Sequence, residues 1–418
     1  MKQRHFCGID FGTSNSVLYL IDPNTSLQPI VVSEPSVIYM MDDFSLGNKG
    51  KFIGNSAIQA YIQYSEKGRF IQSVKSLLSN ASFNYTEIFG GHFHAVDLVA
   101  LILSHLKEKA EALIGYSLTD VVMGRPVYFS QHLPDDQLAQ TRLETAARLV
   151  GFQSISFQFE PVGAALAYEQ LLTEEKTVLV ADFGGGTTDF TVMRLNPQQL
   201  LSVNRKNDIL STGGVYIGGE TFNSRIMWHE LMPYFGYGSQ FESMFKCYDI
   251  PEHFFTTLCH WYHIHHLKTD VYRQDLKDIY FGALNKQAIQ KLCDLIDHDM
   301  GFSLFQAIQE AKHGLSHAQE ADIQFPALSI FHPLSQNRFS EIIESDIQAI
   351  RSSLFQTLEE AKLQIDDIQT VFLTGGTSLV KKVRAIFDES FPPHVIQQDD
   401  DLFISVAKGL SLAHRLVL

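Results

Sequence analysis

Two stretches of this chain share one pattern: CGIDFGTSNS at residues 7–16 and VADFGGGTTD at residues 180–189. Each predicts a buried strand that ends in an aspartate, then a glycine-rich turn with hydroxyl side chains, then a second strand. One such turn would also fit an ordinary hairpin. A matched pair indicates two similar lobes that hold one polyphosphate from opposite sides, which is the arrangement of a nucleotide-binding protein.

The residue types in the two turns suit a phosphate group. Glycine adopts positive φ easily and lets the backbone approach a ligand, and successive N–H groups in such a turn form a nest for an anion. Asp10 and Asp182 would repel bare phosphate, so they predict a Mg²⁺ ion held through its water molecules. The residues expected around the phosphates are Gly12, Thr13, Ser14, Asn15, Gly184, Gly185, Gly186 and Thr187.

Composition limits the classes of protein. A chain of 418 residues with 45% hydrophobic residues predicts two or more globular domains. A net charge of −15 argues against a nucleic-acid or anionic-membrane partner. The four cysteines form no CxxC pair, so we expect neither disulfides nor a zinc ribbon. With no leader peptide and no long apolar run, the sequence predicts a cytoplasmic protein.

Strand hairpins and helices alternate along the chain. This pattern predicts an α/β protein in which a mixed sheet with helices on both faces occurs twice. We expect lobe I over residues 1–173, with an insertion at about 35–115, and lobe II over 174–401, with a variable insertion at about 225–330. A C-terminal helix at about 402–418 is expected to return to lobe I.

Helices and strands outside the two turns follow from apolar spacing. We expect helices over 98–114, 135–150, 161–171 and 343–361, and strands over 121–123, 154–159 and 371–373.

A histidine-rich run, CHWYHIHH at residues 259–266, has two interpretations. His260, His263 and His266 would share one face of a helix and could bind a metal ion. The same run also fits a helix with histidines on its wet face and aromatic side chains in the core. Because nothing in the sequence places a carboxylate beside it, the metal interpretation depends on composition alone.

Six segments, in order, resemble the ATPase region of the DnaK-type heat shock protein 70 family. They are residues 8–16 and 182–189 (the two phosphate loops), 159–168 (FEPVGAALAY), 211–223 (STGGVYIGGETFN), 310–316 (EAKHGLS) and 372–380 (FLTGGTSLV). The resemblance is weak over 40–115 and 225–305. It implies a two-lobed, actin-like ATPase (ribonuclease H-like) fold with the nucleotide in a cleft between the lobes.

In this family an apolar linker, a peptide-binding β-sandwich and a helical lid follow the ATPase region. This sequence stops at Leu418. It therefore resembles the truncated, ATPase-only relatives typified by the bacterial YegD proteins, and a peptide-refolding cycle of the usual kind is not expected.

The resemblance also implies roles at the phosphates. Thr13 and Ser14 would hold the β-phosphate, residues 184–187 would hold the γ-phosphate, and Asp10 and Asp182 would orient Mg²⁺. Lys75, within QSVKSLL at residues 72–78, matches the catalytic lysine that places the attacking water.

Two further carboxylates would complete this polar shell. They are Glu160 and Asp189, and either Asp182 or Asp189 could accept a proton. The alternatives are that Lys75 is a surface lysine and that Glu160 only stabilises the start of a helix.

The adenosine side carries the main departures from the family. Gln309 stands where the family has a glutamate, His313 where it has an arginine stacked on adenine, and Leu379 where it has another arginine. Since histidine is smaller and usually neutral at pH 7, we expect weaker adenine affinity or a looser choice of base. The residues expected on this side are Gly218, Gly219, Glu220, Gln309, Lys312, His313, Ser316, Gly375, Gly376 and Thr377.

These features together predict a chaperone-like switch that binds ATP/ADP with Mg²⁺ and hydrolyses ATP slowly. Hydrolysis would change the angle between the lobes, and an unidentified protein partner would respond to that change. The alternatives are a binding-only pseudo-ATPase, a small-molecule kinase with Glu160 beside its substrate, and an actin-like filament protein with a self-complementary surface.

Overall fold

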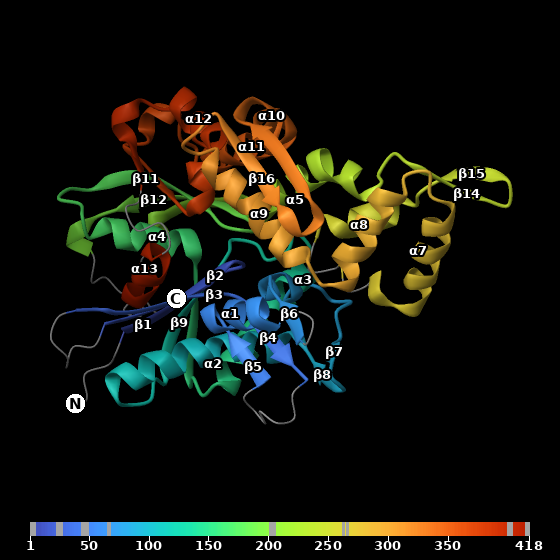
Figure 1. Ribbon diagram of the computed structural model, residues 1–418. Coiled ribbons are helices and arrows are strands. Elements are labelled where there is room, and N and C mark those ends of the chain that lie inside the picture. Colours follow the sequence, from blue (N-terminus) through green and yellow to red (C-terminus); the bar gives the residue numbers. More distant parts are fainter. Residues whose placement is uncertain are drawn as a thin grey trace. The chain divides into compact units, whose positions relative to one another are not determined.

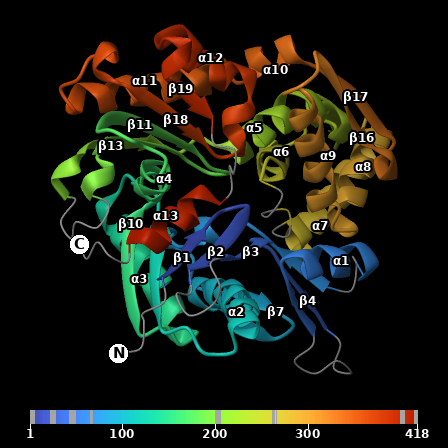
Figure 2. The same ribbon diagram turned by 90° about the vertical axis from the view of Figure 1, so that its left-hand side faces the viewer.

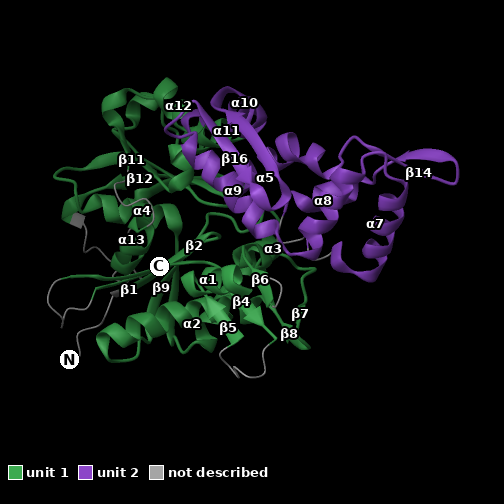
Figure 3. Ribbon diagram, in the orientation of Figure 1, with its two compact units in different colours: residues 1–219, 348–379, 383–418 green, residues 220–347, 380–382 purple. Residues whose placement is uncertain are grey.

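The computed structural model describes residues 6–21, 28–42, 50–64, 68–199, 206–260, 264, 267–398 and 404–413. It divides into two compact units, coloured separately in Figure 3: unit 1 is residues 1–219, 348–379 and 383–418, and unit 2 is residues 220–347 and 380–382. The boundary expected at residue 173 falls inside unit 1, so its role as a border between two lobes stays a prediction. Both glycine-rich hairpins belong to unit 1.

Two five-stranded sheets form the centre of unit 1 (Figure 1). The first has the order β3-β2-β1-β9-β10 and the second the order β13-β12-β11-β18-β19. Their strands are β1 (Phe6–Phe11), β2 (Asn15–Ile21), β3 (Ile30–Pro35), β9 (Asp120–Arg125), β10 (Ser154–Phe159), β11 (Lys176–Phe183), β12 (Thr188–Leu195), β13 (Ile209–Val215), β18 (Thr370–Thr374) and β19 (Ile396–Gln398).

The two sheets have the same topology. In each, three strands run antiparallel through consecutive hairpins, one later strand pairs in parallel with the first of them, and a second later strand pairs in parallel with that one. The register matches as well, because Phe11 pairs with Ser16 in the first hairpin and Phe183 with Thr188 in the second. This duplication confirms the α/β architecture predicted from the two copies of the turn motif.

Two helices lie between the sheets, as Figures 1 and 2 both show: α4 (Glu160–Glu169) and α13 (Ser405–Ala413). Helix α4 packs on β11 and β12, α13 packs on β1, β2 and β9, and the two helices pack on each other. Their approach depends on glycine, because a Cβ at Gly409 would lie 1.6 Å from the carbonyl oxygen of Gly163. The sheets are therefore joined through backbone-to-backbone contact.

Other elements of unit 1 cover the outer faces of the two large sheets and build one three-stranded sheet and one hairpin. Helix α2 packs on β2 and β3, and Phe387 of α12 stands edge-on to Phe183 of β11. These elements are α1 (Asn55–Tyr64), α2 (Ala95–Ile114), α3 (Leu133–Leu149), α12 (Lys381–Ser390), β4 (Ile38–Met41), β5 (Lys51–Ile53), β6 (Gly68–Ile71), β7 (Thr86–Ile88) and β8 (Gly91–Phe93). Helix α11 (Glu344–Glu360) begins in unit 2 and continues in unit 1.

Sequence signals set the ends of several helices. Helix α3 begins with Pro134 and the acidic Asp135 in its first turn, and Gly151 follows its end with φ of 94°. Helix α2 ends at Gly115, which adopts φ of 81° and donates to the carbonyl of Glu111. Among the described residues, no helix is long and apolar enough to cross a membrane.

Unit 2 is mainly helical. Arg225 donates two hydrogen bonds of 2.9 Å to Asp346, which joins its first helix to the start of α11. Its elements are α5 (Gly219–Ile226), α6 (Glu252–Leu258), α7 (Asp270–Gly282), α8 (Lys286–Asp297), α9 (Gly301–Gly314), α10 (Gln336–Ile342), β14 (Gln240–Ser243), β15 (Lys246–Asp249), β16 (Glu320–Phe325) and β17 (Ile330–Ser335). The β14–β15 hairpin ends in Met244 and Phe245, which are 90% and 99% exposed.

Candidate functional site

The two glycine-rich turns meet each other within unit 1. A Cβ at Gly185 would lie 2.5 Å from Oγ of Ser14, and one at Gly186 would lie 3.3 Å from Oγ1 of Thr13. The hydroxyls of the first turn therefore face the backbone of the second, and only glycine at residue 185 leaves room for them. The structure brings the two glycine-rich turns together, as the matched motifs predict.

Backbone and hydroxyl groups hold each turn in place. Ser36 supports the first turn, since its N–H donates to the carbonyl of Ser14 and its hydroxyl to that of Gly12, both at 2.8 Å. In the second turn, the carbonyl of Gly184 accepts from the Thr377 hydroxyl at 3.1 Å and from the Gly219 N–H at 3.2 Å. Ser36 follows β3 and belongs to no motif, so its part in the first turn could not be predicted from the sequence.

Lys75 and Glu160 form a buried ion pair beside the turns. The Nζ of Lys75 donates to Oε1 of Glu160 at 2.7 Å, and their side chains are 11% and 7% exposed. Lys75 lies in a 3₁₀ helix, Val74–Leu77, that follows Ser73 in the left-handed conformation. The surface-lysine alternative is therefore wrong, and Glu160 at the start of α4 has a specific cationic partner.

Four carboxylates, those of Asp10, Glu160, Asp182 and Asp189, lie around this one ammonium group, and burial together with the neighbouring charges raises the pKa of the three aspartates. Burial and the charge of Glu160 raise the pKa of Asp10 to about 7, against the opposing effect of Lys75. Burial, Glu160 and Asp10 raise the pKa of Asp182 well above its usual range. For Lys75, burial alone would lower the pKa, but Glu160 and Asp10 outweigh it and the pKa is raised.

Asp189 is the most enclosed of the four carboxylates. It accepts a hydrogen bond from the N–H of Val127 at 3.0 Å. Burial and Glu160 raise its pKa to about 7, although the bonds from Thr187 and Val127 act in the opposite direction. Asp189 pairs with Asp182 across the hairpin, so the two lie side by side on neighbouring strands.

The donor set fits a hydrated magnesium ion. Burial and the charge of Glu160 raise the pKa values of Asp10 and Asp182, and the charge of Asp10 raises that of Asp182 further. A divalent cation beside them would favour their ionised forms. In the described part of the chain, no three carboxylate, imidazole or thiol side chains converge to bind an ion directly. The ion would therefore be held through its waters and the phosphates, as Mg²⁺ commonly is in nucleotide sites.

The raised pKa of Asp10 predicts how the free energy of unfolding depends on pH in the absence of magnesium. A carboxyl group that binds its proton more tightly when folded contributes stability that is lost as pH rises from 3.8 to about 7. In Mg²⁺-free buffer, Asp10→Asn should raise the free energy of unfolding at pH 8 by on the order of 1–3 kcal/mol and change it little at pH 4. Chemical denaturation at both pH values measures this.

The exposed Asp322 provides the control for that experiment. Asp322→Asn should leave the free energy of unfolding unchanged at both pH values. If Asp10→Asn instead lowers the free energy of unfolding equally at pH 4 and pH 8, the ionised carboxylate of Asp10 does not destabilise the folded state.

The expected adenosine residues belong partly to unit 1. Gly375 follows β18 with φ of 81°, and a Cβ there would lie 2.2 Å from the carbonyl oxygen of Phe183. A Cβ at Gly218 would lie 2.5 Å from the carbonyl oxygen of Gly185. Gly375, Gly376, Thr377, Gly218 and Gly219 are thus positioned by the second phosphate loop.

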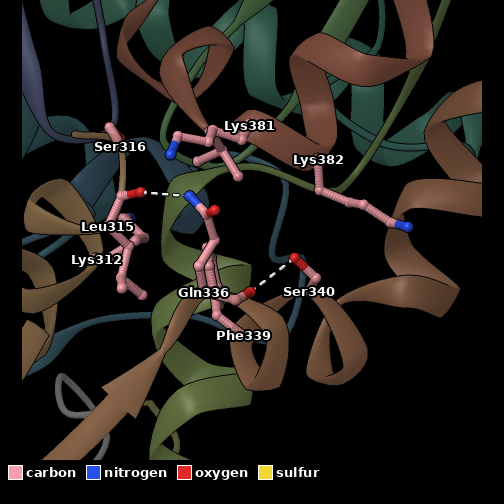
Figure 4. Close-up of a pocket in the computed structure, with 9 residues that line it drawn as sticks. Lys312, Leu315, Ser316, Gln336, Phe339, Ser340, Lys381 and Lys382 are labelled. Atoms are coloured by element: carbon pink, nitrogen blue, oxygen red, sulfur yellow. Dashed lines mark hydrogen bonds between the residues drawn. The ribbon is translucent and has the colours of Figure 1, made fainter. Parts of the chain in front are cut away.

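The remaining expected adenosine residues belong to unit 2. Lys312 and Ser316 line a pocket with Leu315, Gln336, Phe339, Ser340, Val380, Lys381 and Lys382 (Figure 4). Burial lowers the pKa of Lys312 to about 8, against the opposing charge of Glu220. Figure 4 shows the Gln336 amide turned towards the carbonyl of Leu315, to which it donates at 2.8 Å.

The three residues that depart from the family are all exposed. Gln309 and His313 lie on the outer face of α9 in unit 2, and Leu379 lies at the end of a 3₁₀ turn in unit 1. Partial burial and the charge of Lys312 lower the pKa of His313, which favours its neutral form.

The first two residues of the histidine-rich run, Cys259 and His260, lie outside helix α6. Helix α6 ends at Leu258, one residue before Cys259, so the shared helical face expected for the run is wrong for its first residues. His263 and His266 lie outside the described residues.

Comparisons with known proteins agree with this geometry. The family model described as "Hsp70 protein" matches residues 44–236 and 283–410. The chain is 26% identical to the chaperone protein DnaK of Thermosipho melanesiensis, covering 93% of this chain and 56% of that protein. It is 27% identical to the DnaK of Deinococcus deserti, covering 91% of this chain and 55% of that protein.

The chain thus spans just over half the length of these relatives. Between its two matched ranges the family model leaves out residues 237–282, which include the β14–β15 hairpin and all of α7. Since the model matches well over half of the chain, this protein belongs to the Hsp70 family, and its two equivalent sheets form an actin-like ATPase fold.

Proposed function

We propose that this protein binds ATP and ADP with Mg²⁺, hydrolyses ATP slowly, and acts as a chaperone-like switch. The observation that carries the proposal is the contact between the two phosphate loops, with the Lys75–Glu160 pair and three aspartates beside it. Family membership supports nucleotide binding. The change between ATP and ADP states would be read by a protein partner, in a cytoplasmic setting.

The residues of unit 1 divide the work of phosphoryl transfer, which depends on positioning and charge neutralisation. The N–H groups and hydroxyls of residues 12–15 and 184–187 would cradle the phosphates. Lys75, held by Glu160, would offset charge on the γ-phosphate and orient the attacking water. Asp189 or Asp182 would take the proton from that water.

Asp10 and Asp182 would hold the magnesium ion through its waters. When bound, Mg²⁺ would neutralise charge on the phosphates. The adenosine would be bound by the glycines after β18 and by Lys312 and Ser316. Without the family's arginines, His313 and Leu379 should bind adenine more loosely.

The proposal is tested by ligand binding and turnover with pure protein. Saturating Mg-ATP should stabilise the fold by about 3 kcal/mol at a hundredfold excess over Kd, seen as a higher Tm, and phosphate release should be slow. Asp182→Ala should remove both effects. Mg-GTP, compared at the same concentration, reports on the choice of base.

Two results separate this proposal from its main alternative. Stabilisation by Mg-ATP without phosphate release would identify a binding-only pseudo-ATPase, which the departures at Gln309, His313 and Leu379 favour. Neither stabilisation nor release at millimolar nucleotide would overturn nucleotide binding altogether.

A further inference from the structure

Arg125, the last residue of β9, is enclosed in a network that no motif predicts. Its Nη2 donates to both carboxylate oxygens of Asp136 at 2.8 Å, and its Nη1 donates to Oε1 of Gln140 at 2.5 Å. The side chains of Arg125 and Asp136 are 13% and 12% exposed. The guanidinium is therefore fixed by α3, on which Asp136 and Gln140 both lie.

Aromatic rings hold the same guanidinium from two further elements. Its central carbon lies 5.1 Å from the ring centroid of Phe129 and 5.5 Å from that of Phe159. Phe159 directly precedes Glu160, the partner of Lys75. A planar guanidinium suits such stacking, whereas an ammonium does not.

One peptide group connects Arg125 to the carboxylate cluster. The Nε of Arg125 donates to the carbonyl of Pro126 at 3.1 Å. The N–H of that same peptide belongs to Val127 and donates to Asp189 at 3.0 Å in a buried setting. A donor on the carbonyl both orients a peptide and strengthens the hydrogen bond from its N–H.

The segment after this peptide is fixed as well. Nη2 of Arg125 donates to the carbonyl of Val127 at 3.3 Å, and the N–H of Phe129 donates to Asp136 at 2.7 Å. Residues 126–129 thus have little freedom to rotate away from Asp189.

We propose that Arg125 is a positioning residue for ATP hydrolysis: it orients the Pro126–Val127 peptide, whose N–H fixes the carboxylate of Asp189. Asp136 in turn holds the guanidinium. The inference depends on the proposed function, because Asp189 is placed among the groups that act on the attacking water. It assigns Arg125 no contact with nucleotide.

The test uses steady-state ATP hydrolysis by the whole 418-residue chain. Arg125→Lys keeps the positive charge but loses the planar guanidinium and its several N–H donors. The value of kcat should therefore fall by about tenfold, and KM for Mg-ATP should change less than twofold. Asp136→Asn should act in the same direction. Arg148→Lys is the control, since Arg148 lies on the same helix α3 in an exposed pair with Glu144 and should change neither constant.

A double-mutant cycle distinguishes positioning from a purely structural role. If Arg125 acts through Asp189, Arg125→Lys should cost less than about twofold in an Asp189→Asn background. Fully multiplicative losses, or a KM that rises while kcat is unchanged, would overturn the inference while leaving the ATPase intact. An absence of wild-type turnover would overturn the hydrolysis proposal and this inference with it.

Discussion

Replacing Lys75 with alanine will reduce ATP hydrolysis by about 10²–10³-fold. Lys75 is the cation that faces Glu160 at 2.7 Å, and the charges of Asp10 and Asp189 also act on it. Without its ammonium, the γ-phosphate and the attacking water lose an opposite charge that is already in place before reaction. The measurement is phosphate release under single-turnover conditions, together with the Kd for Mg-ATP.

Lys107 supplies a matched control. It is 11% exposed, as Lys75 is, and forms an ion pair of 2.6 Å with Glu111 in α2. Lys107→Ala should cost stability without a comparable loss of rate per folded molecule. If both alanine variants lose hydrolysis equally, or if Lys75→Ala keeps the wild-type rate, Lys75 has no special part in the reaction.

Replacing Gly409 with alanine will destabilise unit 1 by about 3 kcal/mol or more. A Cβ at residue 409 would lie 1.6 Å from the carbonyl oxygen of Gly163 and 3.1 Å from the N of Ala167. The obstacle is backbone on α4, which cannot rotate aside as a side chain could. Thermal unfolding should show a fall in Tm of roughly 10 °C.

Gly314, in the last turn of α9, is the corresponding control. A Cβ there would meet one side-chain atom, on Ala321, at 3.2 Å. Gly314→Ala should therefore change Tm by only a few degrees in either direction. A Gly409→Ala variant that unfolds at the wild-type temperature would show that α4 and α13 can separate at little cost.

The sequence was informative wherever a local pattern and a tertiary requirement coincide. The aspartate, glycine and hydroxyl order around Asp10 and Asp182 determines a hairpin, and its repetition predicts the second sheet. Residues 154–159 alternate in polarity and form β10 over the same range. The proximity of Lys75 and Glu160, by contrast, could be predicted only through resemblance to a family.

Other parts of the site lie beyond any local pattern. Val127 donates to Asp189 through its backbone N–H. Every residue except proline carries this group, so the residue type at 127 does not predict the hydrogen bond. Arg125 is a single basic residue at the end of β9, and no local pattern pairs it with Asp136 of α3. The left-handed backbone at Ser73, just before the helix of Lys75, is set by packing and not by a glycine or asparagine.

The pairing of α13 with the first sheet has a consequence for synthesis of the protein. Strand β1 (Phe6–Phe11) leaves the ribosome long before α13, which covers it and spans residues 405–413. During translation, β1 and the apolar face of α4 therefore stay uncovered until α13 is available to pack on them. Chaperones or the ribosome surface would have to shield this apolar surface until α13 emerges.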